Sequence, residues 1–352
     1  MSKYYTHIIY SIVLFFTLIV SLFITTSCGR VVDYSYGDTV ESIANIGGKP
    51  DGVTIDSKDN YYVTDIGSGA IIKVGNDGVA TTISTGEFNH PDGITVSRND
   101  DKIIYVTDTG SGNLGNGGDE PFASNNDGVV KKVTIAEDGT TTVVTIVDST
   151  VLNAPTGIAT DREGSLYIAD ETNSQIYKIK VVGGIAQNPV PLTKEGALNE
   201  PHGLALVTNN DNSISLITTD QGNNNVVKID LPSTDVNENI TSEETIVTNL
   251  TPPSTEGSFE DGDASNANFN KPHGVGVDSN GAIFISDEDN NRVRIITPGG
   301  NVVTFAGDGL AGDEIGDADK AKFEKPRGLA VDSSGDVLIC DYKNGKVKKV
   351  KK

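Results

Sequence analysis

Histidine and aspartate gather at one short motif in this chain, which consists of a proline, a variable residue and a glycine. Three of the four histidines lie there, His90 just before the proline and His202 and His273 between proline and glycine. Asp51 and Asp92 occupy the same middle position in two further copies. Imidazole nitrogens and carboxylate oxygens are ligands that zinc and manganese accept in proteins. If the fold brings these copies together, Asp51, Asp92, His202 and His273 could hold a divalent ion.

The motif opens a unit that occurs six times. Each unit has a proline-x-glycine start, an apolar strand, a polar turn, a second strand that ends in aspartate, and a third strand. The units begin at Pro50, Pro91, Pro155, Pro201, Pro272 and Pro326. The spacing from proline to aspartate differs between units only by even numbers, which keeps each side chain on its own face of the strand. Six copies of one supersecondary unit predict a repeat architecture.

One position of the unit is small throughout. The residue just before the closing aspartate is Thr64, Thr107, Ala169, Thr219, Ser286 or Cys340. A position that is always small indicates that neighbouring sheets crowd together there. We therefore expect Cys340 to be a packed core residue rather than a reactive thiol.

The repeated unit resembles the NHL repeat over residues 38–352. The shared marks are the proline-x-glycine start, the aspartate that closes the second strand, and an asparagine three residues later, as in Asp170 with Asn173 and Asp287 with Asn290. Units one and two depart from this pattern, because Ser68 and Ser111 stand where asparagine would be. The resemblance implies an all-β fold, a six-bladed β-propeller with four-stranded blades.

Ring closure needs a strand from outside the six units. The sixth unit ends with its third strand at Lys346–Val350, and the segment Thr39–Ile46 has no place in the first unit. An open propeller would leave a strand edge exposed. We expect Thr39–Ile46 to pair with Lys346–Val350 as the missing outer strand.

The middle residue of each proline-x-glycine points toward the mouth of the central channel in related propellers. The resemblance therefore implies a mouth lined by Asp51, Asp92, Thr156, His202, His273 and Arg327. In a six-fold ring Asp51 would oppose His202, and Asp92 would oppose His273. The peptidylglycine amidating lyase is a similar propeller that carries zinc histidines at such motifs. It uses three histidines where two are placed here, which favours histidines that cap strand ends by hydrogen bonds.

Calcium and loops are further candidates for function. The acidic segments 260–263 and 287–290 have oxygen ligands for calcium but lack the spacing of an EF-hand loop, which favours solvated turns. Gluconolactonase-like propellers would need a calcium cluster in the channel, with Asp65, Asp108 and Asp170 as the nearest candidates.

Long insertions are expected on the face of the mouth at 109–126, 251–271 and 306–325, and one on the opposite face at 232–244.

The N-terminus resembles a bacterial lipoprotein signal. Lys3 is followed by an apolar run from Ile8 to Ile24 and then by Cys28. This pattern predicts a signal peptide at 1–27, a lipid on Cys28, a tether at 28–37 and the propeller at 38–352. An uncleaved membrane anchor is the alternative, because about 20 apolar residues span a bilayer. Both interpretations place the propeller outside the cytoplasm in the cell envelope.

The net charge of the chain limits the classes of partner that it can bind. The chain carries 49 acidic and 27 basic side chains, for a formal net charge of -22. Such a surface repels phosphate backbones, so we expect no binding to nucleic acid. The repeats and the lack of a complete catalytic set favour a monomeric binding module for a protein, peptide or glycan. The alternative is an enzyme, a metal-dependent lyase or lactonase-like hydrolase that uses zinc, manganese or calcium at the channel mouth.

Overall fold

The computed structural model describes residues 37–75, 77–110, 127–148, 150–232 and 242–352. The predicted signal, Cys28, most of the tether and parts of two predicted insertions, at 111–126 and 233–241, lie outside the described residues. Within the described ranges, no helix has the length and apolar character needed to cross a membrane.

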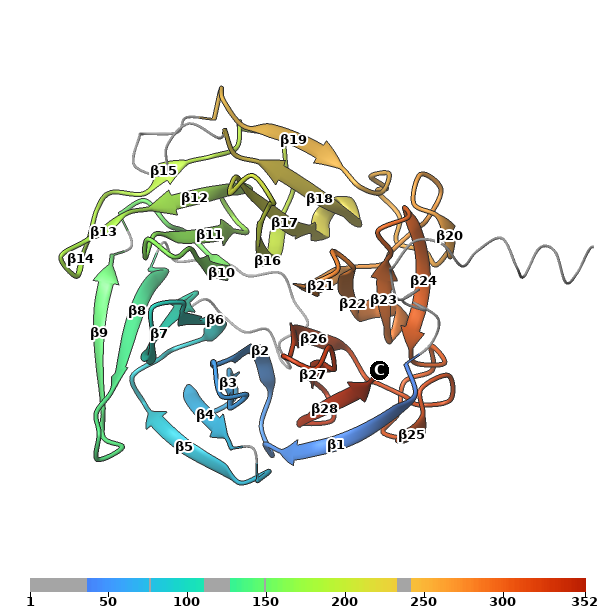
Figure 1. Ribbon diagram of the computed structural model, residues 1–352, viewed down its shortest axis with the longest axis horizontal. Helices are drawn as coiled ribbons and strands as arrows, with labels where there is room; N and C mark the ends of the chain where they lie inside the picture. The colour runs from blue at the N-terminus through green and yellow to red at the C-terminus, as the bar shows by residue number, and fades with distance from the viewer. Residues whose placement is uncertain (1–36, 76, 111–126, 149, 233–241) are drawn as a thin grey trace, which may run out of the picture. The chain divides into compact units, whose positions relative to one another are not determined.

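Six antiparallel sheets of four or five strands are arranged around a central axis as the blades of a propeller, and β13 (Val181–Val182) and β14 (Ile185–Ala186) form a further two-stranded sheet (Figure 1). Blade one contains β2 (Pro50–Ile55), β3 (Tyr61–Asp65), β4 (Ala70–Val74) and β5 (Ala80–Thr85). Blade two contains β6 (Pro91–Ser97), β7 (Asp100–Asp108), β8 (Val129–Ile135) and β9 (Thr141–Val147). Blade three contains β10 (Pro155–Thr160), β11 (Leu166–Asp170), β12 (Gln175–Ile179) and the short β15 (Val190–Pro191).

The other three blades repeat this order. Blade four contains β16 (Pro201–Thr208), β17 (Ile214–Asp220), β18 (Asn225–Asp230) and β19 (Ile246–Asn249). Blade five contains β21 (Pro272–Val277), β22 (Ile283–Asp287), β23 (Arg292–Ile296), β24 (Asn301–Ala306) and an outer β20 (Gly262–Asp263). Blade six contains β26 (Pro326–Val331), β27 (Val337–Asp341), β28 (Lys346–Lys351), β1 (Thr39–Asn45) and an outer β25 (Gly316–Asp317). The predicted six-bladed, all-β propeller is confirmed.

The hydrophobic core lies between the blades. Each of six clusters of buried side chains joins two neighbouring sheets, for example Leu338 and Cys340 of blade six with Val53 and Val63 of blade one. A blade buries its apolar side chains only against its neighbours, so the ring is stable only as a whole.

Glycine brings the blades together at the inner edge. A Cβ on the glycine of any proline-x-glycine would lie 2.1–2.4 Å from the carbonyl oxygen of the middle residue in the next blade. The contacts run around the ring as Gly52 on Asp92, Gly93 on Thr156, Gly157 on His202, Gly203 on His273, Gly274 on Arg327 and Gly328 on Asp51. No side chain fits at these positions, because real Cβ contacts are never this short.

The small residue before the closing aspartate also bridges the blades. The hydroxyl of Thr64 donates to the carbonyl of Asp92 at 2.7 Å, and that of Thr219 donates to the carbonyl of His273 at 2.6 Å. Cys340 is fully buried, lies 3.7 Å from the carbonyl oxygen of Gly52 in blade one, and has a thiol whose pKa is raised well above its usual value by burial. The expected packing role of Cys340 is confirmed.

The closing aspartates hold the chain that enters each blade. Each accepts backbone N–H bonds of 2.6–3.1 Å from the residues before the proline, as Asp65 does from Lys49 and Asp170 from Asn153 and Ala154. The same arrangement recurs at Asp108, Asp220, Asp287 and Asp341. Ser68 donates to Asp65 in place of the usual asparagine, which explains the departure in unit one. These aspartates are structural, as their recurrence indicates.

A cation binds this aspartate in blades two, five and six, and it is fully buried in blades five and six. Arg294 is fully buried, binds Asp287 at 2.7 Å and Asp261 at 2.6 Å, and lies 4.9 Å from the ring centre of Phe269. The same arrangement recurs in two other blades. Lys348 binds Asp341 and lies over the ring of Phe323, and Lys131 binds Asp108 and lies over the ring of Phe88. The predicted insertions 251–271 and 306–325 thus contribute Phe269 and Phe323 to the core, and their strands β20 and β25 lie outermost in their blades.

The N-terminal strand closes the ring as expected. β1 pairs antiparallel with β28 from Thr39 opposite Lys351 to Asn45 opposite Lys346, with a bulge between Ser42 and Ala44. Val40 and Ala44 are buried, in the interfaces between blades five and six and between blades six and one respectively. β1 therefore contributes both hydrogen bonds and core contacts to blade six.

Deletion of residues 30–46 is expected to lower the melting temperature of the whole propeller by on the order of 10 °C, because it exposes β28 and removes Val40 and Ala44 from two interfaces. Circular dichroism melting provides the measurement. The control Glu41→Ala removes only an exposed ion pair with Lys351 and should change the free energy of unfolding by about 1 kcal/mol or less. An unchanged melting temperature after the deletion would show that β1 is dispensable.

Candidate functional site

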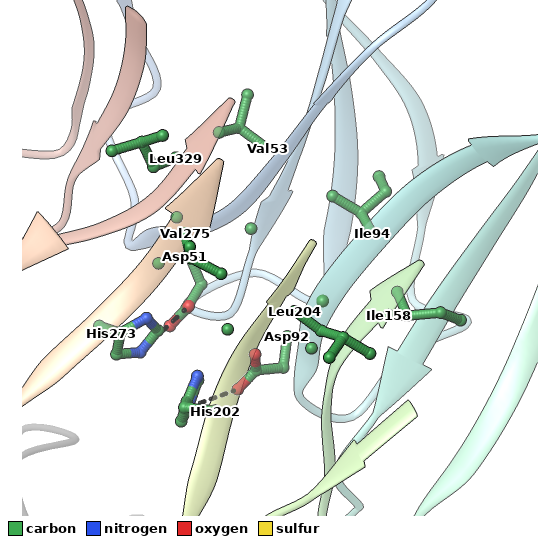
Figure 2. Close-up of a pocket in the computed structure, with 16 residues that line it drawn as sticks. Asp51, Val53, Asp92, Ile94, Ile158, His202, Leu204, His273, Val275 and Leu329 are labelled. Carbon is green, nitrogen blue, oxygen red and sulfur yellow. Dashed lines mark ion pairs between the residues drawn. The ribbon is translucent and has the colours of Figure 1, made fainter. Parts of the chain in front are cut away.

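A cavity of about 60 Å³ lies at the inner edge of the blades, where the six proline-x-glycine motifs meet. Asp51, Asp92, His202 and His273 contribute polar side chains to its lining. The residue after each glycine contributes an aliphatic side chain, and these are Val53, Ile94, Ile158, Leu204, Val275 and Leu329. Figure 2 shows the two carboxylates facing the two imidazoles, with the aliphatic side chains to one side of them.

The structure pairs the polar side chains differently from the sequence-based expectation. Nε2 of His202 lies 3.7 Å from Oδ2 of Asp92, and Nε2 of His273 lies 3.7 Å from Oδ1 of Asp51. The expected oppositions of Asp51 with His202 and Asp92 with His273 are therefore wrong. The partners come from blades two apart, and the imidazole rings of His202 and His273 are only 3.7 Å apart between their centres. The ring is so narrow at this point that side chains from nonadjacent blades lie 3.7 Å apart.

Two residues of the predicted mouth do not line the cavity. Thr156 is fully buried, and its hydroxyl lies 3.3 Å from the carbonyl oxygens of Ala169, Pro201 and His202. Arg327 instead binds carboxylates, with Nη1 2.7 Å from Oδ2 of Asp51 and Nε 3.3 Å from Oε1 of Glu288. Thr156 is thus a packing residue, and Arg327 holds Asp51 in place.

Burial keeps the imidazoles at the mouth neutral. It lowers the pKa of His202 and His273 well below the usual value, and neighbouring cations act in the same direction. Burial likewise lowers the pKa of His90 to about 4, and the Nδ1 atom of His90 lies 2.7 Å from the hydroxyl of Thr109. Burial and the nearby charge of Asp51 raise the pKa of Asp92 well above its usual value. Neutral groups avoid the large cost of a buried charge.

This arrangement gives the predicted metal site no support. Within the described ranges, no three His, Cys, Asp or Glu side chains are placed to hold a metal ion. The acidic segment 260–263 is likewise engaged, because Asp261 binds Arg294 and Thr304. Asp65, Asp108 and Asp170 accept backbone N–H bonds instead of forming a calcium cluster.

A second set of equivalent residues, next to the proline-x-glycine motifs, was missed by the sequence analysis. It consists of the residue after each closing aspartate, namely Ile66, Thr109, Glu171, Gln221, Glu288 and Tyr342. The N–H of most of these residues donates to the carbonyl just before the proline, as Glu171 does to Ala154. Tyr342 lies under the guanidinium of Arg327, 3.7 Å from its ring centre. The signal was present in the sequence, because the position directly follows an aspartate that recurs in all six units.

Comparison with known proteins agrees with this architecture. Residues 269–296 and 323–350, in blades five and six, match the family model described as NHL repeat. Blades five and six thus match NHL repeats. A 93-residue part of this propeller is 31% identical to the chloroplastic protein Suppressor of Quenching 1 of Arabidopsis thaliana, and the match covers 26% of this chain but only 9% of that protein.

Solved structures share the fold. An auxiliary nutrient binding protein from Bacteroides thetaiotaomicron is 18% identical, with a TM-score of 0.66 over 87% of this chain and 69% of that one. Virginiamycin B lyase from Staphylococcus aureus, in an inactive histidine-to-alanine form, is 15% identical, with a TM-score of 0.55 over 88% and 98%. A gluconolactonase from Xanthomonas campestris is 12% identical, with a TM-score of 0.60 over 90% of each chain. At these identities the likeness concerns the fold alone.

Glu171 makes the stability of the NHL propeller depend on pH. Burial and the charge of Glu200 raise its pKa to about 7, whereas Arg327 and Lys271 lower it and Asp170 raises it. A carboxyl whose pKa is raised by folding stabilises the folded state at low pH, and this contribution is lost as pH rises from about 4 to about 7.

Glu171→Gln is therefore expected to raise the free energy of unfolding at pH 8 by on the order of 1–3 kcal/mol and to leave it unchanged at pH 4. Urea unfolding at the two pH values measures this difference. The exposed Glu163→Gln serves as the matched control and should show no gain at either pH. An equal effect of Glu171→Gln at both pH values would contradict the assignment.

Proposed function

We propose that this NHL propeller is a lipid-anchored, extracytoplasmic binding module whose ligand site is the mouth of the central channel and the loops around it. The carrying observation is the cavity of about 60 Å³ at the meeting point of all six blades. It joins a polar end to an aliphatic one, which is typical of sites that bind part of a small molecule, peptide or glycan. Such a site on a rigid ring needs no catalytic group.

The state of the ionisable groups supports binding over catalysis. Arg327 is engaged by Asp51 and Glu288, the imidazoles are neutral, and Cys340 is buried with a raised pKa. General bases work best with a pKa near the operating pH, whereas burial lowers the pKa of both imidazoles well below the usual value. The solved propellers described as auxiliary nutrient binding proteins, from two Bacteroides species, support a binding role as fold-level analogues.

The anchor supports the extracytoplasmic location. The apolar run from Ile8 to Ile24 and the following Cys28 resemble a lipoprotein signal. The formal charge of -22 argues against direct binding of the propeller to anionic headgroups, so a covalent lipid is the better explanation for membrane attachment.

A second candidate function is a metal-dependent lyase or lactonase-like hydrolase. The observation in its favour is the convergence of His202, His273 and two carboxylates at one end of the channel. Propellers described as streptogramin B lyase and gluconolactonase share the fold. Stoichiometric zinc or manganese in the purified protein, lost in His202→Ala and His273→Ala together, would favour this enzyme over the binding module.

Cys28→Ser is expected to abolish incorporation of radiolabelled palmitate into the full chain expressed in cells, because the thiol is the point of lipid attachment. Cys340→Ala is the matched control, since it removes the other cysteine and should leave the label in place. A membrane-bound, unaltered chain that takes up no label would instead indicate an uncleaved anchor.

A further inference from the structure

We propose that the cavity at the channel mouth binds a primary alkylammonium group, supplied by a free alkylamine or by the lysine side chain of a peptide. This inference rests on the proposed function and adds the chemical class of its ligand. The polar end of the cavity would bind the ammonium group, and the aliphatic end would hold the alkyl chain.

The polar end contains an acceptor that has no donor within the described structure. The side chain of Asp51 is 1% exposed, and its Oδ1 atom makes no hydrogen bond. Nε2 of His273 lies 3.7 Å from this oxygen, which is beyond hydrogen-bond distance. Buried carboxylate oxygens nearly always have a donor, so the site calls for an N–H or O–H group from a bound molecule.

Charge favours a cationic donor over a neutral one. Asp51 and Asp92 both line the cavity, and burial together with the charge of Asp51 raises the pKa of Asp92 well above its usual value, so that Asp92 stays neutral. The charge that a ligand meets is therefore the carboxylate of Asp51, whose other oxygen is bound by Arg327 from outside the lining. Hydrogen bonds between a cation and a carboxylate are about twice as strong as neutral ones. A ligand carboxylate would instead meet the like charge of Asp51.

The number of donors also fits an ammonium group. An ammonium has three N–H donors and no acceptor. Oδ1 of Asp51 and the nearby carboxyl group of Asp92 can accept two of these bonds, and Nε2 of His202 or His273 can accept the third in the tautomer that leaves this nitrogen unprotonated. An alcohol has a single donor and would leave most of these acceptors unused.

The aliphatic end sets the length and shape of the ligand. Six side chains, one from each blade, line it and are each only 5–9% exposed. One water needs about 10–15 Å³ of such volume, so about 60 Å³ accommodates roughly four to six non-hydrogen atoms. A butylammonium ion has five, as does a lysine side chain from Cβ to Nζ. The close lining favours an unbranched chain.

The test is isothermal titration of the full chain at pH 7 with four small probes. We expect n-butylamine to bind about tenfold tighter than 1-butanol, because only the amine carries a charge. tert-Butylamine has the same atoms in a branched shape and should not bind, and butyrate should not bind because its charge is reversed. Equal affinity for butanol and n-butylamine, binding of butyrate, or no binding of n-butylamine would overturn the ammonium site.

Two variants test whether n-butylamine binds at Asp51. Asp51→Asn should weaken n-butylamine binding about tenfold, since it removes the charge and keeps the shape. Asp138→Asn is the matched control, because Asp138 lies on the exposed turn between β8 and β9. This variant should bind n-butylamine as the unaltered protein does. The four-probe comparison on the unaltered chain decides the matter even if Asp51→Asn fails to fold. Unchanged affinity of a folded Asp51→Asn variant would place the amine elsewhere.

Two further probes distinguish the source of the ammonium group. Nα-acetyl-lysine N-methylamide and the peptide Gly-Lys-Gly should bind at least as well as n-butylamine if a peptide lysine is the ligand, and worse if the site is built for a free amine. Binding of butanol or butyrate in place of the amine would refute an ammonium ligand but would leave intact the proposal that the propeller is a binding module. Failure of all probes together with stoichiometric metal would refute both the ammonium site and the proposed function.

Discussion

Each blade of this propeller meets the next through a glycine that has no room for a side chain. The glycine of one proline-x-glycine lies against the carbonyl of the middle residue in the following blade, and Gly328 returns the contact to Asp51 in blade one. Direct contact between their backbones is the closest approach that two sheets can make. It sets the width of the central channel, and the interface cores and the buried ion pairs of blades five and six lie outward of it.

The chemistry of the mouth follows from this close approach. Because the channel is narrow, side chains that start from different blades compete for the same small volume, and the polar ones must satisfy one another or a ligand. Arg327 is bound by Asp51 and Glu288 and stacks on Tyr342, whereas Oδ1 of Asp51 is left without a donor. The candidate ligand site is therefore the part of the cluster that the protein does not satisfy by itself.

Much of the architecture could be predicted from the sequence, because repetition made each position visible six times. The blade count, the role of the aspartates such as Asp170, the packing of Cys340 and the pairing of the N-terminal segment with Lys346–Val350 all follow from the repeat. The partners within the mouth could not be predicted in the same way. Asp51 and Asp92 occupy equivalent positions, and only the tilt and reach of individual side chains decide that each contacts a histidine two blades away. Glu171 and Tyr342 were missed because their position varies in residue type from unit to unit.

The close approach of the blades is tested most directly by Gly328→Ala, measured by urea unfolding beside Gly299→Ala. The methyl group at 328 would lie 2.1 Å from the carbonyl oxygen of Asp51, at the seam between blades six and one, whereas no atom lies within 3.7 Å of a methyl group at 299. The account predicts that Gly328→Ala lowers the free energy of unfolding by roughly 3 kcal/mol and that Gly299→Ala leaves it nearly unchanged. Equal stability of the two variants would contradict the central claim that the glycine contacts set the ring.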